Sequence, residues 1–102
     1  MIIKIRDYTP DDTAMSYEDG KRCLADILKY IDHESVTLDF KNINFVITAF
    51  LNPIIGDLIF EKGSDVMKRI NITNATEPII KKIKQVKDGT LLKREDMVEW
   101  FS

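Results

Sequence analysis

The sequence predicts one α/β domain in which a small mixed β-sheet packs against helices that lie mainly on one side, followed by a short C-terminal helix. Its 102 residues are enough for one hydrophobic core. Hydrophobic residues make up 44% of the chain and charged residues 31%, proportions that are typical of globular proteins. Segments with the two-residue alternation of strands occur between segments with helical spacing, and this order indicates an α/β fold.

The first elements are a strand, a helix and a second strand. Ile3 and Ile5 alternate with basic residues, which predicts a half-buried strand. Ser16, with Asp19 three residues later, has the pattern of a helix N-cap, and we expect the helix to end near residue 32. Residues 36–40 alternate apolar and polar side chains and give the clearest strand pattern in the chain.

A second extended apolar segment, residues 43–47, follows directly and completes a strand pair. Residues 50–60 then change to helical spacing. Because Pro53 disfavours a helical conformation at the residue before it, we expect Asn52 to be the N-cap and Pro53 the first helical residue. Gly63 is predicted to end this helix as its C-cap.

The C-terminal third is predicted to contain one more strand and two helices. Residues 66–72 have a strand pattern, and Asn74 with Glu77 forms a second capping pattern before a helix. Asp88 and Gly89 are expected to break that helix. The chain therefore divides into a domain of residues 1–89 and an amphipathic helical tail of residues 90–102.

The net charge is −2 and is unevenly distributed. Nine acidic and three basic residues from Asp7 to Asp39 give −6, whereas nine basic and three acidic residues from Lys62 to Arg94 give +6. Ordinary solvated faces explain this asymmetry, and so would pairing between copies in a homo-oligomer. The N-terminal segment is charged and the longest uncharged stretch falls short of the roughly 20 apolar residues of a membrane helix. We therefore expect a cytoplasmic protein without a membrane partner.

The sequence offers no set of residues for catalysis or metal binding. One cysteine, Cys23, and one histidine, His33, are too few for a zinc site built from these ligands. They lie too far apart along one helix for a catalytic dyad, and the scattered glycines form no phosphate-binding loop. We therefore expect no enzymatic activity, no metal and no cofactor, with Cys23 as a small buried residue.

Basic residues gather near the C-terminal end and leave an alternative function open. A nucleic-acid-binding accessory protein would use such a segment, but a solvated helix face is the more common reason for a run of charges, and no base-reading motif accompanies it. At the chain end, Trp100 and Phe101 either anchor a partner or pack on their own domain. The basic residues are Lys81, Lys82, Lys84, Lys87, Lys93 and Arg94.

Residues 36–51 resemble the core of a STAS domain, named for the sulfate-transporter and anti-sigma-factor-antagonist superfamily. A strand ending in Asp39-Phe40 precedes a short apolar strand, the pair Thr48-Ala49, and an apolar helix beginning Phe50-Leu51-Asn52. The order is similar to that of an uncharacterised bacterial STAS-like group, and the resemblance extends over residues 2–86. It implies a mixed sheet with helices on one side and a regulatory role in protein interaction.

In anti-sigma-factor antagonists, the implied partner is a histidine-kinase-like ATPase that phosphorylates a Ser or Thr at the start of this helix. The usual acceptor position is Ala49 here, and Ile47 replaces the usual Asp, so that Thr48 is the hydroxyl at hand. Thr48 is either a phosphoacceptor or a helix cap. Asp39, at a strand end, either lines a site or caps a loop. The partner-binding residues that the resemblance implies are Asp39, Thr48, Phe50, Asn52 and Pro53.

Overall fold

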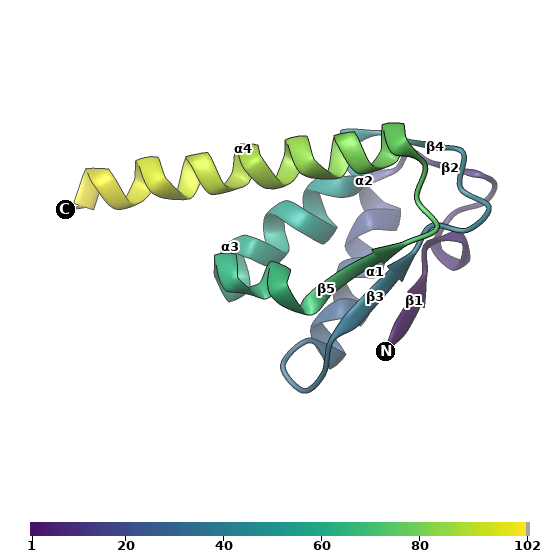
Figure 1. The fold of residues 1–102 in the computed structure, drawn as a ribbon, viewed down its shortest axis with the longest axis horizontal. Coiled ribbons are helices and arrows are strands. Elements are labelled where there is room, and N and C mark those ends of the chain that lie inside the picture. The colour runs from purple at the N-terminus through teal and green to yellow at the C-terminus, as the bar shows by residue number, and fades with distance from the viewer. Residues whose placement is uncertain (102) are drawn as a thin grey trace.

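The computed structural model describes the backbone of residues 1–101 and the side chains of residues 1–93. It confirms the α/β class: a small sheet carries its helices mainly on one side (Figure 1). All described strand pairings are parallel, whereas mixed strand directions were expected. One sheet has the order β1-β3-β5 and the other pairs β2 with β4. The strands are β1 (Ile2–Lys4), β2 (Thr13–Ala14), β3 (Val36–Asp39), β4 (Phe45–Val46) and β5 (Ile70–Thr73).

Strand β4 does not extend the main sheet, contrary to the strand pair expected for residues 36–47. It pairs instead with β2, with Phe45 opposite Thr13. The reason lies in the connecting loop, where Asn42 adopts a left-handed conformation with φ 65° and turns the chain away from β3. The Asn44 backbone N–H then donates to the Asp12 carbonyl at 2.8 Å and holds the loop beside the segment that leads into β2.

The helices cover one face of the main sheet and enclose the core with it. Side chains along β3 alternate between buried and half-buried, so only the face toward the helices is apolar. Phe40 and Phe50 are the largest fully buried side chains. The helices are α1 (Tyr17–Tyr30), α2 (Thr48–Leu51), the π-helical segment η2 (Asn52–Asp57), α3 (Leu58–Lys62) and α4 (Glu77–Phe101), with 3₁₀ turns η1 (Ile5–Tyr8) and η3 (Ser64–Arg69).

Helix α1 begins as predicted and packs unusually close to the helical segment that follows β4. The Ser16 side chain accepts a hydrogen bond from the Asp19 backbone N–H at 3.2 Å, which caps the helix. Gly20 lies one turn later against α2, where a Cβ atom would lie 2.4 Å from the Phe50 carbonyl oxygen. Glycine is therefore required there for the two backbones to approach each other.

The helix after β4 begins earlier than predicted. Its first residue is Thr48 and its N-cap is Ile47, so Asn52 is not the N-cap and Pro53 lies inside the helical run. A proline has no N–H for the α-helical ladder, and the local change to π-helix in η2 accommodates it. The predicted end is confirmed: Gly63 is the C-cap, with φ 90° and its N–H bonded to the Ile59 carbonyl.

Helix α4 is continuous from Glu77 to Phe101, so the predicted break at Asp88 and Gly89 is wrong, and the expected boundary after residue 89 falls within it. A glycine inside a helix costs only about 1 kcal/mol, which burial of the helix face outweighs. Thr90, for example, is buried against η2. The C-terminal half extends away from the body of the molecule (Figure 1). Trp100, Phe101 and Arg94 lie outside the described side chains.

Candidate functional site

Thr48 is exposed on the first turn of the helical run that begins at α2. It is the first helical residue, and no side chain makes a capping hydrogen bond at Ile47. The interpretation of Thr48 as a helix cap is therefore wrong. Its hydroxyl lies beside the positive end of the helix dipole, where an anion would be stabilised. Asn52, one turn later, is also exposed, and its backbone N–H bonds to the Thr48 carbonyl.

Phe50 and Pro53 cannot touch a partner in this structure, because both are buried. The Phe50 side chain belongs to the hydrophobic core, and the Pro53 ring packs against α1 beside the Cβ position of Gly20. The implied partner-binding role of these two residues is thus replaced by a packing role. Their apolar character is equally suited to a core or to an interface, so the sequence did not distinguish the two.

An exposed aromatic residue three positions before Thr48 was missed. Phe45 is 47% exposed, and the Lys82 ammonium lies 4.1 Å from the centre of its ring. Lys82 also donates to the Val46 carbonyl at 2.6 Å, which fixes α4 against β4. The sequence carries no signal that distinguishes Phe45 from the buried phenylalanines of the same apolar stretch. We call the surface formed by Phe45, Thr48, Asn52 and Lys82 the α2 face.

Asp39 ties loops together at the end of β3. Its Oδ1 atom accepts hydrogen bonds at 2.9 Å from the side-chain amide of Asn74 and from the backbone N–H of Lys41. These bonds, that from Asn74 first, hold the pKa of the Asp39 carboxyl below its usual value. Of the two roles expected for Asp39, lining a site or capping a loop, these contacts are those of a loop cap. Asn74 is engaged here and not as the predicted N-cap of α4, which begins at Glu77.

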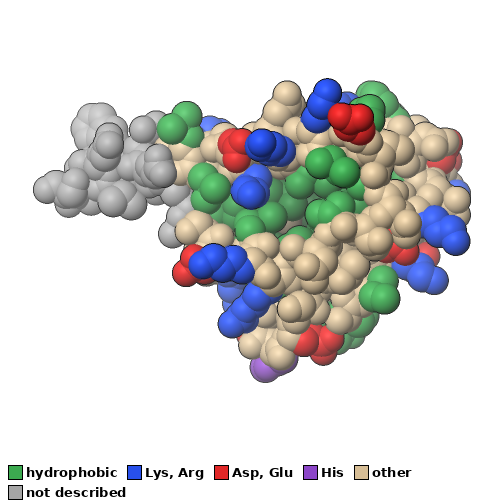
Figure 2. All heavy atoms as spheres, viewed as in Figure 1, with side chains coloured by type: hydrophobic (Ala, Val, Ile, Leu, Met, Phe, Trp, Pro, Cys, Tyr) green, Lys and Arg blue, Asp and Glu red, His purple; other side chains and the backbone are tan. Residues whose placement is uncertain are grey.

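The basic segment does not form one continuous surface. Lys82 is occupied by Phe45 and the Val46 carbonyl, Lys87 is half-buried, and Lys81, Lys84 and Lys93 are exposed. On the face shown in Figure 2, basic side chains are scattered among acidic and uncharged ones. Such a mixture of charges is typical of a solvated helix, whereas a phosphate-binding surface needs a continuous stripe of basic side chains.

Cys23 and the acidic side chains are the described residues that bear on catalytic and metal chemistry. Cys23 is fully buried as predicted, and burial followed by the charge of Asp26 raises the pKa of its thiol to about 12. A thiol with this pKa carries almost no thiolate at neutral pH and is a poor nucleophile. Over the part of the chain that the structure describes, no three His, Cys, Asp or Glu side chains are arranged to hold a metal ion. Within the same part, no helix has the length and apolar character needed to cross a membrane.

The family model for the STAS-like domain of unknown function (DUF4325) matches residues 19–79, more than half of the chain. The chain belongs to this STAS-like family. The matched region runs from the first turn of α1 through β5 to the start of α4, and so contains the helical run with Thr48 and Asn52. Neither the curated proteins nor the solved structures contain a significant match.

Proposed function

We propose that this STAS-like chain is a non-catalytic regulatory module that binds a protein partner through the α2 face. The supporting observation is that Thr48 is exposed at the start of a helix and that Phe45, three residues earlier in the chain, is half-exposed. An exposed aromatic anchor beside a polar, modifiable residue is a common composition for a protein-binding surface. The partner class that the family resemblance suggests is a histidine-kinase-like ATPase.

Phosphorylation of Thr48 would switch this surface by local electrostatics. A phosphate there would gain from the backbone N–H groups and dipole of the helix start. The Lys82 ammonium, bonded to the carbonyl of Val46 two residues earlier, would add a second favourable charge. The same dianion in an interface would oppose a partner shaped for the neutral hydroxyl, so that modification would release it.

The experiment is an affinity capture from host lysate, with and without ATP, using wild type, Asn52→Arg and Asn71→Arg. Both asparagines are exposed, but only Asn52 belongs to the α2 face, whereas Asn71 lies on β5. We expect an ATPase-like protein to be captured by wild type and Asn71→Arg and lost with Asn52→Arg. Mass spectrometry of the recovered chain should find phosphate on Thr48 and none in Thr48→Val.

Equal capture by the two arginine variants would exclude the α2 face as the binding surface. The nucleic-acid alternative predicts a different result: capture that nuclease abolishes and that falls steeply with salt. Lys81→Gln with Lys84→Gln would then reduce binding, since both side chains are exposed on α4. The engagement of Lys82 within the molecule is the reason that we rank this alternative second.

A further inference from the structure

Strand β1 leaves one edge of the main sheet without a strand beside it, as far as the described residues extend. It pairs with β3 only and is the first strand in the order β1-β3-β5. The Thr37 N–H donates to the Met1 carbonyl at 2.8 Å, so Met1 directs its backbone toward β3. Because backbone groups alternate along a strand, the N–H and carbonyl of Ile2 point to the open edge.

The side chains at this edge are apolar, which is unusual for an exposed strand. Ile2 is 62% exposed and Met1 is 45% exposed. Edge strands are normally protected by charges, proline or a bulge, and here Lys4 is the one charged residue on β1. The other edge of the sheet differs, because the exposed side chain on β5 is the polar Asn71.

A groove runs beside the open edge, between β1 and α1, with a volume of about 400 Å³. One of its carboxylates, that of Asp26, is already engaged within the molecule. The Tyr8 hydroxyl donates to Asp26 at 2.5 Å, and the Lys29 ammonium lies 3.1 Å from the same carboxylate. A neighbouring molecule would therefore meet the aromatic rings of Tyr8 and Tyr30 and the apolar side chains of β1, and the Asp26 carboxylate would not need a new partner. The groove is lined by Met1, Ile2, Ile3, Lys4, Asp7, Tyr8, Asp26 and Tyr30.

We propose that a second copy of this chain occupies the edge, through antiparallel pairing of β1 with β1 of the other copy about a twofold axis at Ile3. The two three-stranded sheets would become one continuous sheet with the helices of both copies on the same face. In this register Ile2 lies opposite Lys4 of the partner copy, so the lysine stem covers the exposed isoleucine. The two lysines do not face each other, which avoids like-charge repulsion between opposite residues.

A different register would not satisfy these conditions as well. Pairing about Ile3 matches all three residues of β1 with β1 of the other copy, whereas pairing about Ile2 matches only Ile2 with Ile2 within the bounds of the strand. The Ile3 side chain is buried on the helix side next to the groove, so the Ile3-centred register also places two apolar side chains together at the axis. The interface uses none of the α2 face residues, and the proposed partner site remains free.

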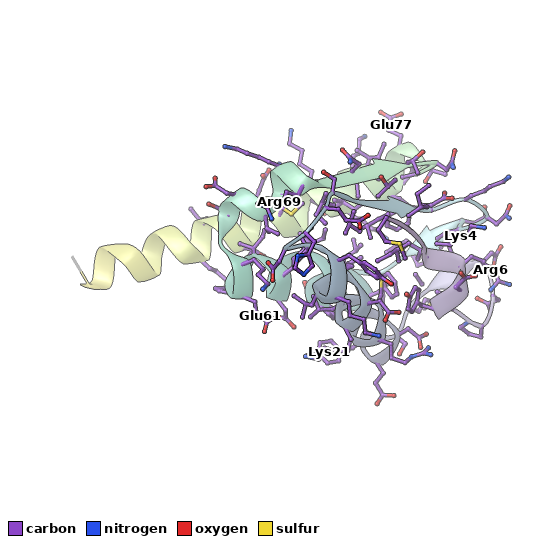
Figure 3. The ribbon with its side chains drawn as sticks, turned by 90° about the horizontal axis from the view of Figure 1, so that it is seen from below. Lys4, Arg6, Lys21, Glu61, Arg69 and Glu77 are labelled. Carbon is purple, nitrogen blue, oxygen red and sulfur yellow. The ribbon has the colours of Figure 1, made fainter. Side chains whose placement is uncertain are left out.

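Figure 3 shows Lys4 and Arg6 at the end of the molecule opposite the end of α4, so pairing at β1 does not require the C-terminal half of that helix. Dimerisation through β1 therefore requires neither pairing of the acidic and basic segments between copies nor exchange of the C-terminal helix. It also explains why an isoleucine stands exposed on an otherwise polar sheet face.

The first test measures the mass of the untagged full chain by sedimentation equilibrium over a range of concentrations. We expect twice the 11.8 kDa of one chain at the highest concentrations, for wild type and for the control Ile80→Lys. Ile80 is 50% exposed on α4, so its substitution changes an equally apolar surface elsewhere. Ile2→Lys should give one chain's mass with an unchanged circular dichroism spectrum. A wild-type monomer at all concentrations, or a dimer that survives Ile2→Lys, would overturn the proposal.

A second measurement examines the register and does not depend on Ile2→Lys folding. Opposite residues in a hydrogen-bonded antiparallel pair have Cα atoms about 5.5 Å apart, within reach of a disulfide. A mixture of Ile2→Cys and Lys4→Cys chains should therefore cross-link under mild oxidation, while each variant alone should not. Cys23 is buried and does not compete. Cross-linking that is equal in the mixture and in the separate variants would exclude this register.

Discussion

Substitution of Gly20 by alanine examines the closest backbone approach in the structure. A Cβ atom at this position would lie 2.4 Å from the Phe50 carbonyl oxygen and 3.1 Å from the Pro53 ring. The first of these atoms belongs to the backbone of a buried helical turn, so no side-chain rotation can relieve the contact. Helix α1 and the helical run from α2 into η2 would have to move apart.

The expected loss of stability is the difference between two opposing effects. Alanine is favoured over glycine inside a helix by about 1 kcal/mol. Overpacking of a core by one carbon costs about 1–3 kcal/mol, and we take the upper end because the neighbour is rigid. The free energy of unfolding should therefore fall by about 2 kcal/mol, which lowers the midpoint temperature by roughly 10 °C in a domain of this size.

The assay is urea unfolding followed by far-ultraviolet circular dichroism, with Gly89→Ala as the matched control. Gly89 is also inside a helix, but a Cβ atom there would have no neighbour within 4 Å. That variant should gain about 0.5–1 kcal/mol. If Gly20→Ala is stabilised as much as Gly89→Ala, the two helices are not packed as closely as described and the reasoning fails.

Three further predictions concern side chains. Lys82→Met should lower the free energy of unfolding by about 1–3 kcal/mol, because the charged hydrogen bond to the Val46 carbonyl is lost. Lys84→Met, at an exposed position, should change it by less than about 0.5 kcal/mol. Equal effects of the two substitutions in urea unfolding would contradict the role given to Lys82. Cys23 should not react with a thiol reagent at pH 8 in the native state and should react once urea unfolds the chain, because its pKa is raised to about 12; rapid native labelling would refute its burial. The hydrogen bond from Tyr8, followed by that from Lys29, lowers the pKa of the Asp26 carboxyl in the folded chain. The ionised carboxylate therefore stabilises the fold fully above the ordinary carboxyl pKa of about 4, and this stabilisation is lost as the pH falls through the lower pKa of the folded state. The difference in unfolding free energy between wild type and Asp26→Asn should therefore shrink as pH falls below about 4, and a constant difference would show that the carboxylate is not stabilised in the folded state.

Local signals predicted the elements that depend on neighbours in the chain. The Ser16 cap and the Gly63 C-cap are confirmed, because each requires only a hydrogen bond or a dihedral angle within one turn. The alternation of residues 36–39 identified β3 for the same reason. The α/β class follows from the order of such elements and is confirmed, and so is the family that the resemblance of residues 36–51 implied.

The candidate site was predicted less well, because exposure is a property of the packed molecule. Thr48 and Asn52 are exposed as a binding surface requires, but Phe50 is buried and Phe45 takes its place. Both are phenylalanines in an apolar stretch, and no periodicity distinguishes them. The contact of Lys82 with Phe45 joins residues from two elements far apart in the chain, which a single sequence does not reveal.

The sequence by itself determined the α/β class, the strand β3, the helix ends set by Ser16 and Gly63, and the burial of Cys23. These features arise from dihedral preferences, short-range hydrogen bonds and the hydrophobic period, all of which act within a few residues. Only the tertiary structure decided that β4 pairs with β2, that Pro53 lies within a helix, and that α4 continues through Gly89. At Pro53 and Gly89 a local preference of about 1–3 kcal/mol against the helix was outweighed by burial of apolar surface against distant segments. The pairing of β4 with β2 depends on a hydrogen bond between Asn44 and Asp12, which lie far apart in the chain.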